Sequence, residues 1–159
     1  MDRPQEKLTT GRILFVGIAV IVFVLDRVTK ALVAASIPYG TEVPAIGHLV
    51  GITNVRNSGA AFGIAPAGTW IFALASVVVS IGLVVYVMRA PTQPWNVAVL
   101  GLVLGGTVGN GYDRILVGTV TDFVNVHFWP VFNVADSAIS TGVVLLIAGY
   151  LIRREPHEL

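Results

Sequence analysis

The chain has 159 residues, of which 55% are hydrophobic and only 12% are charged. A soluble domain of ordinary composition has about a quarter charged residues, so this excess of apolar side chains points to lipid as the solvent. The net charge of +1 argues against a nucleic-acid surface, and the absence of cysteine excludes disulfides, thiolate metal sites and cysteine nucleophiles.

Four segments are long and apolar enough to be membrane-spanning helices, since about 20 residues cross the roughly 30 Å of hydrocarbon. We expect these helices at about residues 13–35, 69–88, 94–112 and 136–152. The first could instead be a cleavable signal peptide, because basic residues precede its apolar run. The run continues past Asp26 and Lys30 without a small-x-small cleavage site, which favours a retained helix. The sequence therefore predicts a single membrane domain over residues 1–159.

Basic residues indicate how these helices are oriented, because cytoplasmic loops are enriched in Lys and Arg. Those on one side of the four-helix arrangement are Arg3, Lys7, Arg12, Arg89, Arg153 and Arg154. Both termini are therefore expected in the cytoplasm, with connections 36–68 and 113–135 facing outward. In the first connection, Thr, Val and Ile alternate with turn-forming Gly and Pro, which is typical of short strands. We expect a small sheet on the outer membrane surface, with turns at Gly47 and Gly51.

The third predicted helix carries Gly101, Gly105 and Gly109 at intervals of four. This spacing places small residues on one helix face and lets another backbone approach closely. We interpret the three glycines as packing residues.

Charged residues at membrane depth are costly unless they are paired or lined by water, so they mark ion pairs or functional sites. Asp26 and Lys30 are four apart on one helical face, which predicts a structural ion pair. Asp113 and Arg114 are adjacent and so point in different directions along a helix. Each is expected to contact another element and to anchor the structure there.

Asp122 and Asp136 have no comparable basic neighbour. Asp136 begins the fourth predicted helix, so an N-cap role is the alternative to a functional one. Both lie at the same outer level, and two close carboxyl groups share one proton because both cannot ionise easily. The ionised group can then take a proton from water while the protonated group donates to a peptide carbonyl. The helix dipole favours Asp136 as the ionised group.

Other chemistries fit the sequence less well. His48, His127 and His157 are scattered along the chain and no HisGluxxHis run occurs, so no metal site is predicted. Ser58 could act with His127, but the GlyxSerxGly elbow is absent. Two interpretations outside hydrolysis stay open. One is a proton-coupled transporter whose aspartates relay protons; the other is a structural membrane subunit whose acids pair with a partner's cations.

Five sequence blocks, in order, resemble the lipoprotein signal peptidase family, also called type II signal peptidases. The blocks are LDRVTK (25–30), NSGAAFG (57–63), GGTVGNGYDR (105–114), VTDFV (120–124) and FNVADSAI (132–139). The resemblance implies an all-α membrane protein, with four transmembrane helices, a small extracytoplasmic β cradle and a short outer helix. It also implies an aspartyl endopeptidase of the bacterial cytoplasmic membrane. Such enzymes remove the signal peptide of prolipoproteins on the amino side of a cysteine that carries a diacylglyceryl group.

By this resemblance, Asp122 and Asp136 are the catalytic dyad, and Asp26 and Lys30 match the family's pair in the first helix. The polar residues that shape the substrate site are Asn57, Asn110, Arg114 and Asn133, with Asp113 beside Arg114. The implied partners are prolipoproteins and membrane lipid, with globomycin-type inhibitors expected to bind the dyad, and no cofactor is implied.

Two sequence features lie close to the dyad: Gly111 and a group of aromatic residues. Gly111 stands where the family often has a bulkier apolar residue, which bears on loop shape and substrate fit. The neighbouring aromatic residues could contact the substrate's lipid, but we favour a role as anchors at the membrane interface, as aromatics generally have. They are Phe123, Phe128, Trp129 and Phe132.

Overall fold

The computed structural model describes residues 4–59, 67–89 and 93–153. Within them, four helices and three strands follow one another along the chain. They are α1 (Pro4–Ser36), β1 (Glu42–Ile46), β2 (Val50–Asn57), α2 (Ala67–Arg89), α3 (Pro94–Leu116), β3 (Val120–Asn125) and α4 (Val134–Arg153).

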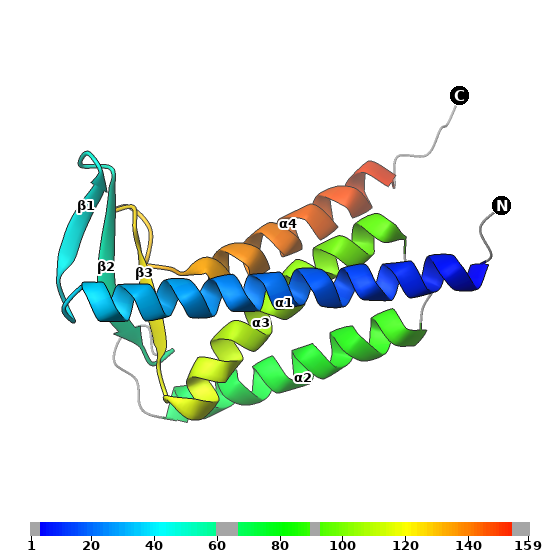
Figure 1. Cartoon of the computed structure of the whole chain (residues 1–159), viewed down its shortest axis with the longest axis horizontal. Coiled ribbons are helices and arrows are strands. Elements are labelled where there is room, and N and C mark those ends of the chain that lie inside the picture. The colour runs from blue at the N-terminus through cyan, green and yellow to red at the C-terminus, as the bar shows by residue number, and fades with distance from the viewer. Residues whose placement is uncertain (1–3, 60–66, 90–92, 154–159) are drawn as a thin grey trace.

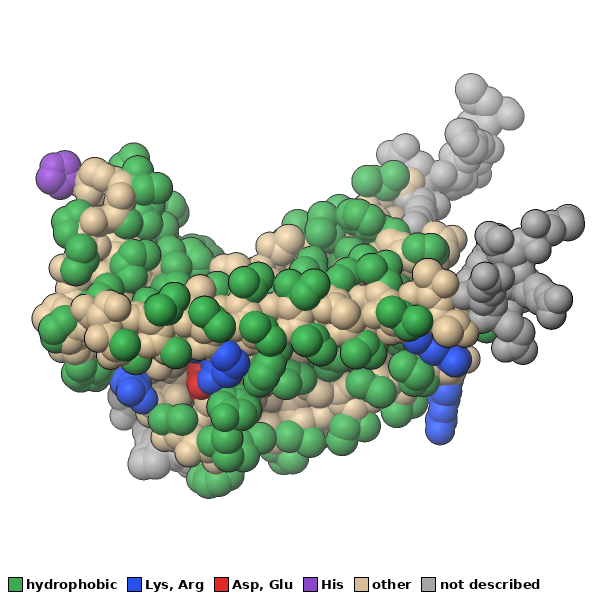
Figure 2. Space-filling model, in the orientation of Figure 1, with side chains coloured by type: hydrophobic (Ala, Val, Ile, Leu, Met, Phe, Trp, Pro, Cys, Tyr) green, Lys and Arg blue, Asp and Glu red, His purple; other side chains and the backbone are tan. Residues whose placement is uncertain are grey.

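The helices lie lengthwise beside one another, with the sheet at one end of the bundle (Figure 1). Among the described residues, Leu8–Ser36, Gly68–Arg89 and Val134–Ile152 are long and apolar enough to cross a membrane. The remaining helix, α3, has 23 residues and packs against the other three helices. Large hydrophobic side chains dominate the outer surface of the bundle (Figure 2). The predicted class, a membrane protein of four helices with a small sheet, is confirmed.

Glycines let α3 approach its neighbours closely. A Cβ atom on Gly101 would lie 2.9 Å from a carbonyl oxygen of α1, and one on Gly105 would lie 2.6 Å from another. On a different face of α3, a Cβ atom on Gly106 would overlap the carbonyl oxygen of Ala135 in α4. Because real Cβ atoms do not tolerate such contacts, these positions require glycine. The packing role predicted for Gly101 and Gly105 is thus confirmed, and Gly106 was not part of that prediction.

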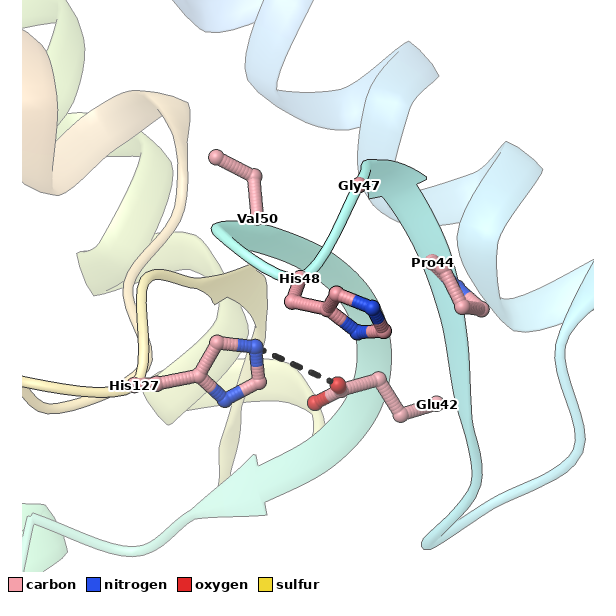
Figure 3. A pocket seen from close by; sticks show the side chains of 6 residues that line it. All are labelled: Glu42, Pro44, Gly47, His48, Val50 and His127. Carbon is pink, nitrogen blue, oxygen red and sulfur yellow. Dashed lines mark ion pairs between the residues drawn. The ribbon is translucent and has the colours of Figure 1, made fainter.

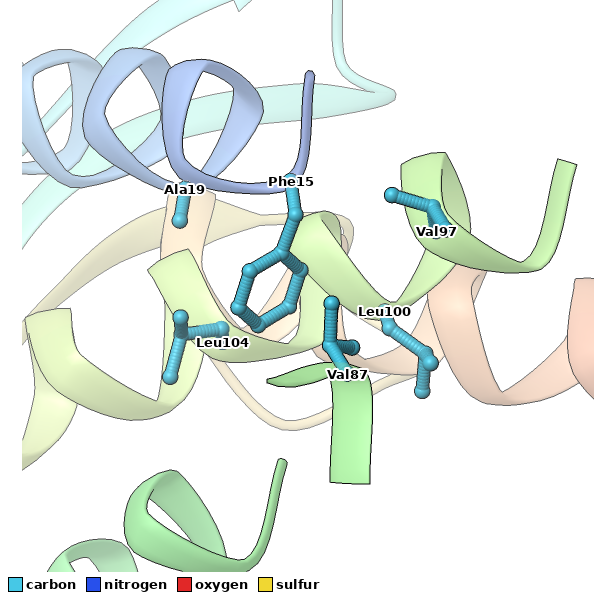
Figure 4. Packing of buried hydrophobic residues seen from close by; sticks show 6 residues of the cluster. All are labelled: Phe15, Ala19, Val87, Val97, Leu100 and Leu104. Carbon is cyan, nitrogen blue, oxygen red and sulfur yellow. The ribbon is translucent and has the colours of Figure 1, made fainter. Parts of the chain in front are cut away.

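A hydrophobic core joins α1, the last turn of α2 and the first half of α3 (Figure 4). At its centre, the Phe15 side chain is fully buried, which is unusual in a bundle that exposes most of its large apolar residues to lipid. The cluster consists of Phe15, Ala19, Val87, Val97, Leu100 and Leu104.

The sheet is antiparallel with strand order β1-β2-β3. The turn between β1 and β2 contains Gly47, whose φ of 51° is a conformation that favours glycine. Gly51 was predicted as a second turn point, and that prediction is wrong. It lies inside β2, where the side chain of Glu42 occupies the space that a Cβ atom would need.

The connection predicted over residues 113–135 is more ordered than a loop. Helix α3 continues to Leu116, so Asp113 and Arg114 belong to its last turn, and β3 follows. The prediction missed β3, although its alternating Val and Thr residues are a strand signal. The described parts of the two connections contain no short outer helix, and residues 60–66 lie outside the described residues.

The four aromatic residues near β3 differ in exposure, and Phe132 is half-buried. Phe128 and Trp129 are exposed, at 86% and 65%, as interface anchors would be. Phe123 is buried, so its predicted anchoring role is wrong: both faces of β3 are covered at that position. The backbone of Phe132 pairs with Val124 beside it.

Candidate active site

Asp122 lies in the middle of β3, where both faces of the strand are buried, and only 2% of the residue is exposed. Asn57 donates from Nδ2 to Asp122 Oδ2 at 2.9 Å, and Asn133 donates from Nδ2 to Oδ1 at 2.6 Å. Burial raises the pKa of Asp122 above its ordinary value, and the nearby charge of Asp136 raises it further, while both amides oppose the increase. Asp122 is therefore a carboxyl group suited to keeping a proton.

Asp136 lies in the first turn of α4, and its predicted alternative role as N-cap is wrong. The N-cap is Asn133, whose Oδ1 accepts the N–H of Asp136 at 2.9 Å. The carboxylate of Asp136 accepts the N–H of Asn133 at 3.2 Å in return. This reciprocal arrangement is a capping box, and it leaves Asp136 Oδ1 free to accept Asn110 Nδ2 at 2.7 Å. The N-terminal position also favours the ionised form of a carboxyl group.

Two asparagine side chains join the aspartates into one network. Asn133 and Asn110 are buried, and Asn133 Nδ2 lies 3.2 Å from Asn110 Oδ1. Asn133 therefore contacts Asp122 and Asp136 directly, while Asn110 connects Asp136 to the same amide. The structure thus brings both aspartates together with Asn57, Asn110 and Asn133, all five of which were predicted site residues.

A cluster of charges lies behind this network. Lys30 Nζ is 2.9 Å from Asp26 Oδ2, as their spacing predicts, and 2.8 Å from Asp113 Oδ2. The same ammonium donates to Asn110 Oδ1 at 2.9 Å. On the other side, Asp26 Oδ1 accepts the backbone N–H of Ala135 in α4 at 3.1 Å. The ion pair in α1 is therefore linked directly to the residues that hold Asp136.

The adjacent residues Asp113 and Arg114 contact different helices, as predicted. Asp113 pairs with Lys30 and with Arg27 of α1. The guanidinium of Arg114 lies over the ring of Phe72 in α2, 5.3 Å from its centroid. The buried Nε of Arg114 has no hydrogen-bond partner in the described structure, so this side chain retains an unused donor at the site.

Sequence reasoning missed one participant, Arg27. It donates to Asp26 Oδ2 at 2.6 Å and also pairs with Asp113. Its signal was present in the sequence, because a basic residue within a predicted membrane span requires a partner. The choice of partner could not be predicted, because Asp113 is distant in sequence and comes close only through the packing of α1 against α3.

A second group of titratable side chains lines a hollow of about 210 Å³ beside the sheet (Figure 3). His127 Nε2 lies 3.6 Å from Glu42 Oε1, and His48 faces the same hollow. The histidines that looked scattered in the sequence are thus partly gathered, although His157 lies outside the described residues. Within the described residues, no group of three His or acidic side chains could hold a metal ion.

Four helices, with buried Asp122 and half-buried Asp136 both hydrogen-bonded by Asn133, form an arrangement suited to a membrane aspartic peptidase. Comparison with known proteins is more specific: the model of the family described as signal peptidase (SPase) II matches residues 18–152. The chain belongs to the signal peptidase II family.

Several relatives share most of the chain. A lipoprotein signal peptidase of Rhodococcus jostii is 45% identical over 159 residues, which cover 96% of this chain and 80% of that protein. One of Pseudomonas aeruginosa is 42% identical and covers 86% of each chain. Among solved structures, a bacterial membrane enzyme determined by the in meso method at 2.3 Å resolution is 32% identical. Its TM-score is 0.80, and the match covers 91% of this chain and 93% of that one.

Proposed function

We propose that this chain removes the signal peptide from prolipoproteins whose cysteine carries a diacylglyceryl group, cutting on the amino side of that cysteine. Family membership and relatives named lipoprotein signal peptidase support this substrate class. The observation that carries the proposal is the amide network through which Asn133 contacts both Asp122 and Asp136. The negative charge of Asp136 also raises the pKa of Asp122, as expected when two neighbouring carboxyl groups hold one proton between them.

The chemistry follows from that shared proton. Ionised Asp136 removes a proton from a water molecule as the water oxygen attacks the scissile carbonyl carbon. Asp122 gives its proton to the carbonyl oxygen, which yields a tetrahedral diol. When the diol collapses, the carbon–nitrogen bond breaks, one hydroxyl proton returns to Asp122, and the proton held by Asp136 passes to the leaving nitrogen. The products are a free carboxyl group and a free amine, and the dyad regains its starting state.

The hydrogen bonds assign different tasks to the two aspartates. The helix N-terminus and the N–H of Asn133 stabilise the ionised form of Asp136. Asp122 lies in a strand and has no such dipole, and burial together with the charge of Asp136 raises its pKa. Because the amides occupy fixed positions before substrate arrives, little reorganisation is needed as charge moves during the reaction. Asn57 holds Asp122 from the side of β2, and the positive charge of Arg114 acts on both aspartates.

The proposed location is the outer face of the bacterial cytoplasmic membrane, with both termini in the cytoplasm. In support, the sheet, whose strand β3 carries Asp122, and the start of α4, which carries Asp136, lie towards one end of the bundle, while the first turn of α1 and the last turn of α4 lie at the other (Figure 1). Among the described basic residues, Arg12, Arg89 and Arg153 lie in the parts of α1, α2 and α4 near that second end. An apolar signal helix with a lipid at its cleavage point would present the scissile bond at the level of the dyad. Membrane lipid and globomycin-type inhibitors are expected to bind there too.

The contacts of Asp26 bear on the transporter alternative. A proton-relaying aspartate needs to exchange its proton during the cycle. Asp26 is fully buried and bound by Lys30, Arg27 and a backbone N–H. These contacts hold a fixed carboxylate, so the structure favours a structural role for the charges in α1 and leaves the chemistry to the dyad.

The decisive experiment measures cleavage of a diacylglyceryl-modified prolipoprotein by the wild type, Asp122→Asn and Asp136→Asn. Each substitution keeps the side-chain size and removes the titrating proton. We expect both variants to insert into membranes and to lose cleavage. A variant that cleaves at a near-normal rate would show that its aspartate is structural. A wild type that inserts and folds but cuts no modified prolipoprotein would refute the proposed function.

A further inference from the structure

Arg27 occupies an unusual position on α1. Its guanidinium donates from Nη2 to Asp26 Oδ2 at 2.6 Å and to the carbonyl oxygen of Gly109 at 3.3 Å, and from Nη1 to Asp113. It lies 5.0 Å from the ring centroid of Tyr112 and 5.9 Å from that of Phe23. The side chain is only 22% exposed. A cation held by two carboxylates and two rings has few alternative orientations, so its geometry is fixed by packing.

The charge balance of the cluster depends on Arg27. Asp26 and Asp113 contribute two negative charges, while Lys30 and Arg27 contribute two positive ones. A lysine ammonium has three N–H donors, and those of Lys30 face Asp26, Asp113 and Asn110. Lys30 therefore has no further donor to offer when Arg27 is removed, and the cluster would keep an uncompensated negative charge in a buried place.

Two contacts carry the effect of this cluster to the dyad. Asp26 accepts the N–H of Ala135, the residue immediately before Asp136. Lys30 holds the oxygen of Asn110, whose nitrogen binds Asp136. An excess negative charge would draw the Lys30 ammonium towards the carboxylates and away from Asn110. The position of Asp136 would then be less well defined.

We propose that Arg27 is a positioning residue for the dyad, acting through Asp26 and Asp113 to fix the start of α4. This inference rests on the proposed peptidase function. Arg27 touches none of the reacting groups, so its loss should reduce kcat and leave KM almost unchanged. Lysine would restore the charge but not the planar fork that reaches two carboxylates at once, so it should restore the rate only in part.

The test compares Arg27→Gln, Arg27→Met and Arg27→Lys with Arg56→Gln, which removes an exposed cation on β2. Arg27→Met removes the same charge but keeps an unbranched apolar stem against the two rings, and Arg27→Lys keeps the charge, so the set separates lost packing from lost charge. With diacylglyceryl-modified prolipoprotein as substrate, we expect kcat to fall about tenfold in the Gln and Met variants, as for a lost bond to a charged group, with KM within about twofold. Arg27→Lys should lie between them and the wild type, and Arg56→Gln should match the wild type.

Two further measurements distinguish a positioning role of Arg27 from a general loss of stability. Hydrogen exchange of a peptide covering residues 132–138 should quicken in Arg27→Met and stay unchanged in Arg56→Gln. The double variant Arg27→Gln/Asp113→Asn should lose less activity than the product of its two single losses, because the residues act through one contact. Wild-type kcat in Arg27→Met, or strictly multiplicative losses, would overturn the inference. A wild type without cleavage would refute the proposed function, and unchanged exchange in Arg27→Met would then refute the positioning role separately.

Discussion

Asn133 has two separable tasks, so substitutions there test the site directly. Its Oδ1 caps α4 by accepting the N–H of Asp136 at 2.9 Å, and its Nδ2 donates to Asp122 at 2.6 Å. Serine is about as good an N-cap as asparagine, but it has no amide that could reach Asp122. Alanine provides neither contact. Asn133→Ser therefore removes the bridge to the dyad and keeps the cap, while Asn133→Ala removes both.

The two losses differ in size and in what they affect. Asp122 becomes ionised as it gives up its proton, and a hydrogen bond to a charged group contributes about 1.5–3 kcal/mol, which corresponds to about a 10- to 100-fold change in rate. A lost N-cap costs about 1 kcal/mol of stability. We expect both Asn133 variants to lose about 10- to 100-fold in kcat. The alanine variant should also lose about 1 kcal/mol more in free energy of unfolding than the serine variant.

Cleavage of a diacylglyceryl-modified prolipoprotein gives kcat, and denaturant unfolding in detergent gives the stability difference. Asn125→Ser is a suitable control, since that asparagine lies in the same strand as Asp122 but contacts Glu42 and the backbone of His127. If Asn133→Ser retained the wild-type kcat while Asn133→Ala did not, the cap alone would matter, and the bridging amide would have no part in the chemistry.

Three other predictions follow from the same contacts. Asn57→Ala removes an amide that lowers the pKa of Asp122, so this pKa should rise further. Because Asp122 acts as the acid, the alkaline limb of the pH–rate profile should move to higher pH. A shift of that limb to lower pH would contradict the assignment. Gly106→Ala places a methyl group against the Ala135 carbonyl, and should destabilise the protein by about 1–3 kcal/mol, lowering its Tm and its cleavage rate together. Lys30→Met leaves buried carboxylates with one cation, a change that costs about 3–5 kcal/mol; an unchanged Tm would show that the network adds little to stability.

The helices were predictable because lipid imposes a simple rule on them. A stretch of about 20 apolar residues can cross the membrane only as a helix, since its backbone groups find no other hydrogen-bond partners there. The same rule singled out Asp122 and Asp136, because charges are rare in such surroundings. The sequence thus located the candidate dyad, whose catalytic role stays a prediction.

The surroundings of the dyad depend on contacts that sequence spacing cannot reveal. Asp113 was placed in a loop, but α3 continues past it because Lys30 and Arg27 neutralise its charge from α1. Asn133, rather than Asp136, proved to be the N-cap, although both types of residue favour that position. Only the packing of distant segments distinguishes these alternatives.

The composition of α3 explains how a polar site can exist at the end of an apolar bundle. Its glycines bring the backbones of α1 and α4 close, and a Cβ atom on Gly109 would lie 2.9 Å from Asp26 Oδ2. The charges of α1 therefore meet Asn110 and the start of α4 in a space too narrow for lipid. In such a space an unpaired charge is costly, so the paired arrangement is strongly preferred over alternatives. Close packing at the glycines thus restricts the ion cluster to one arrangement. The cluster in turn holds the N-terminal end of α4, which carries Asp136.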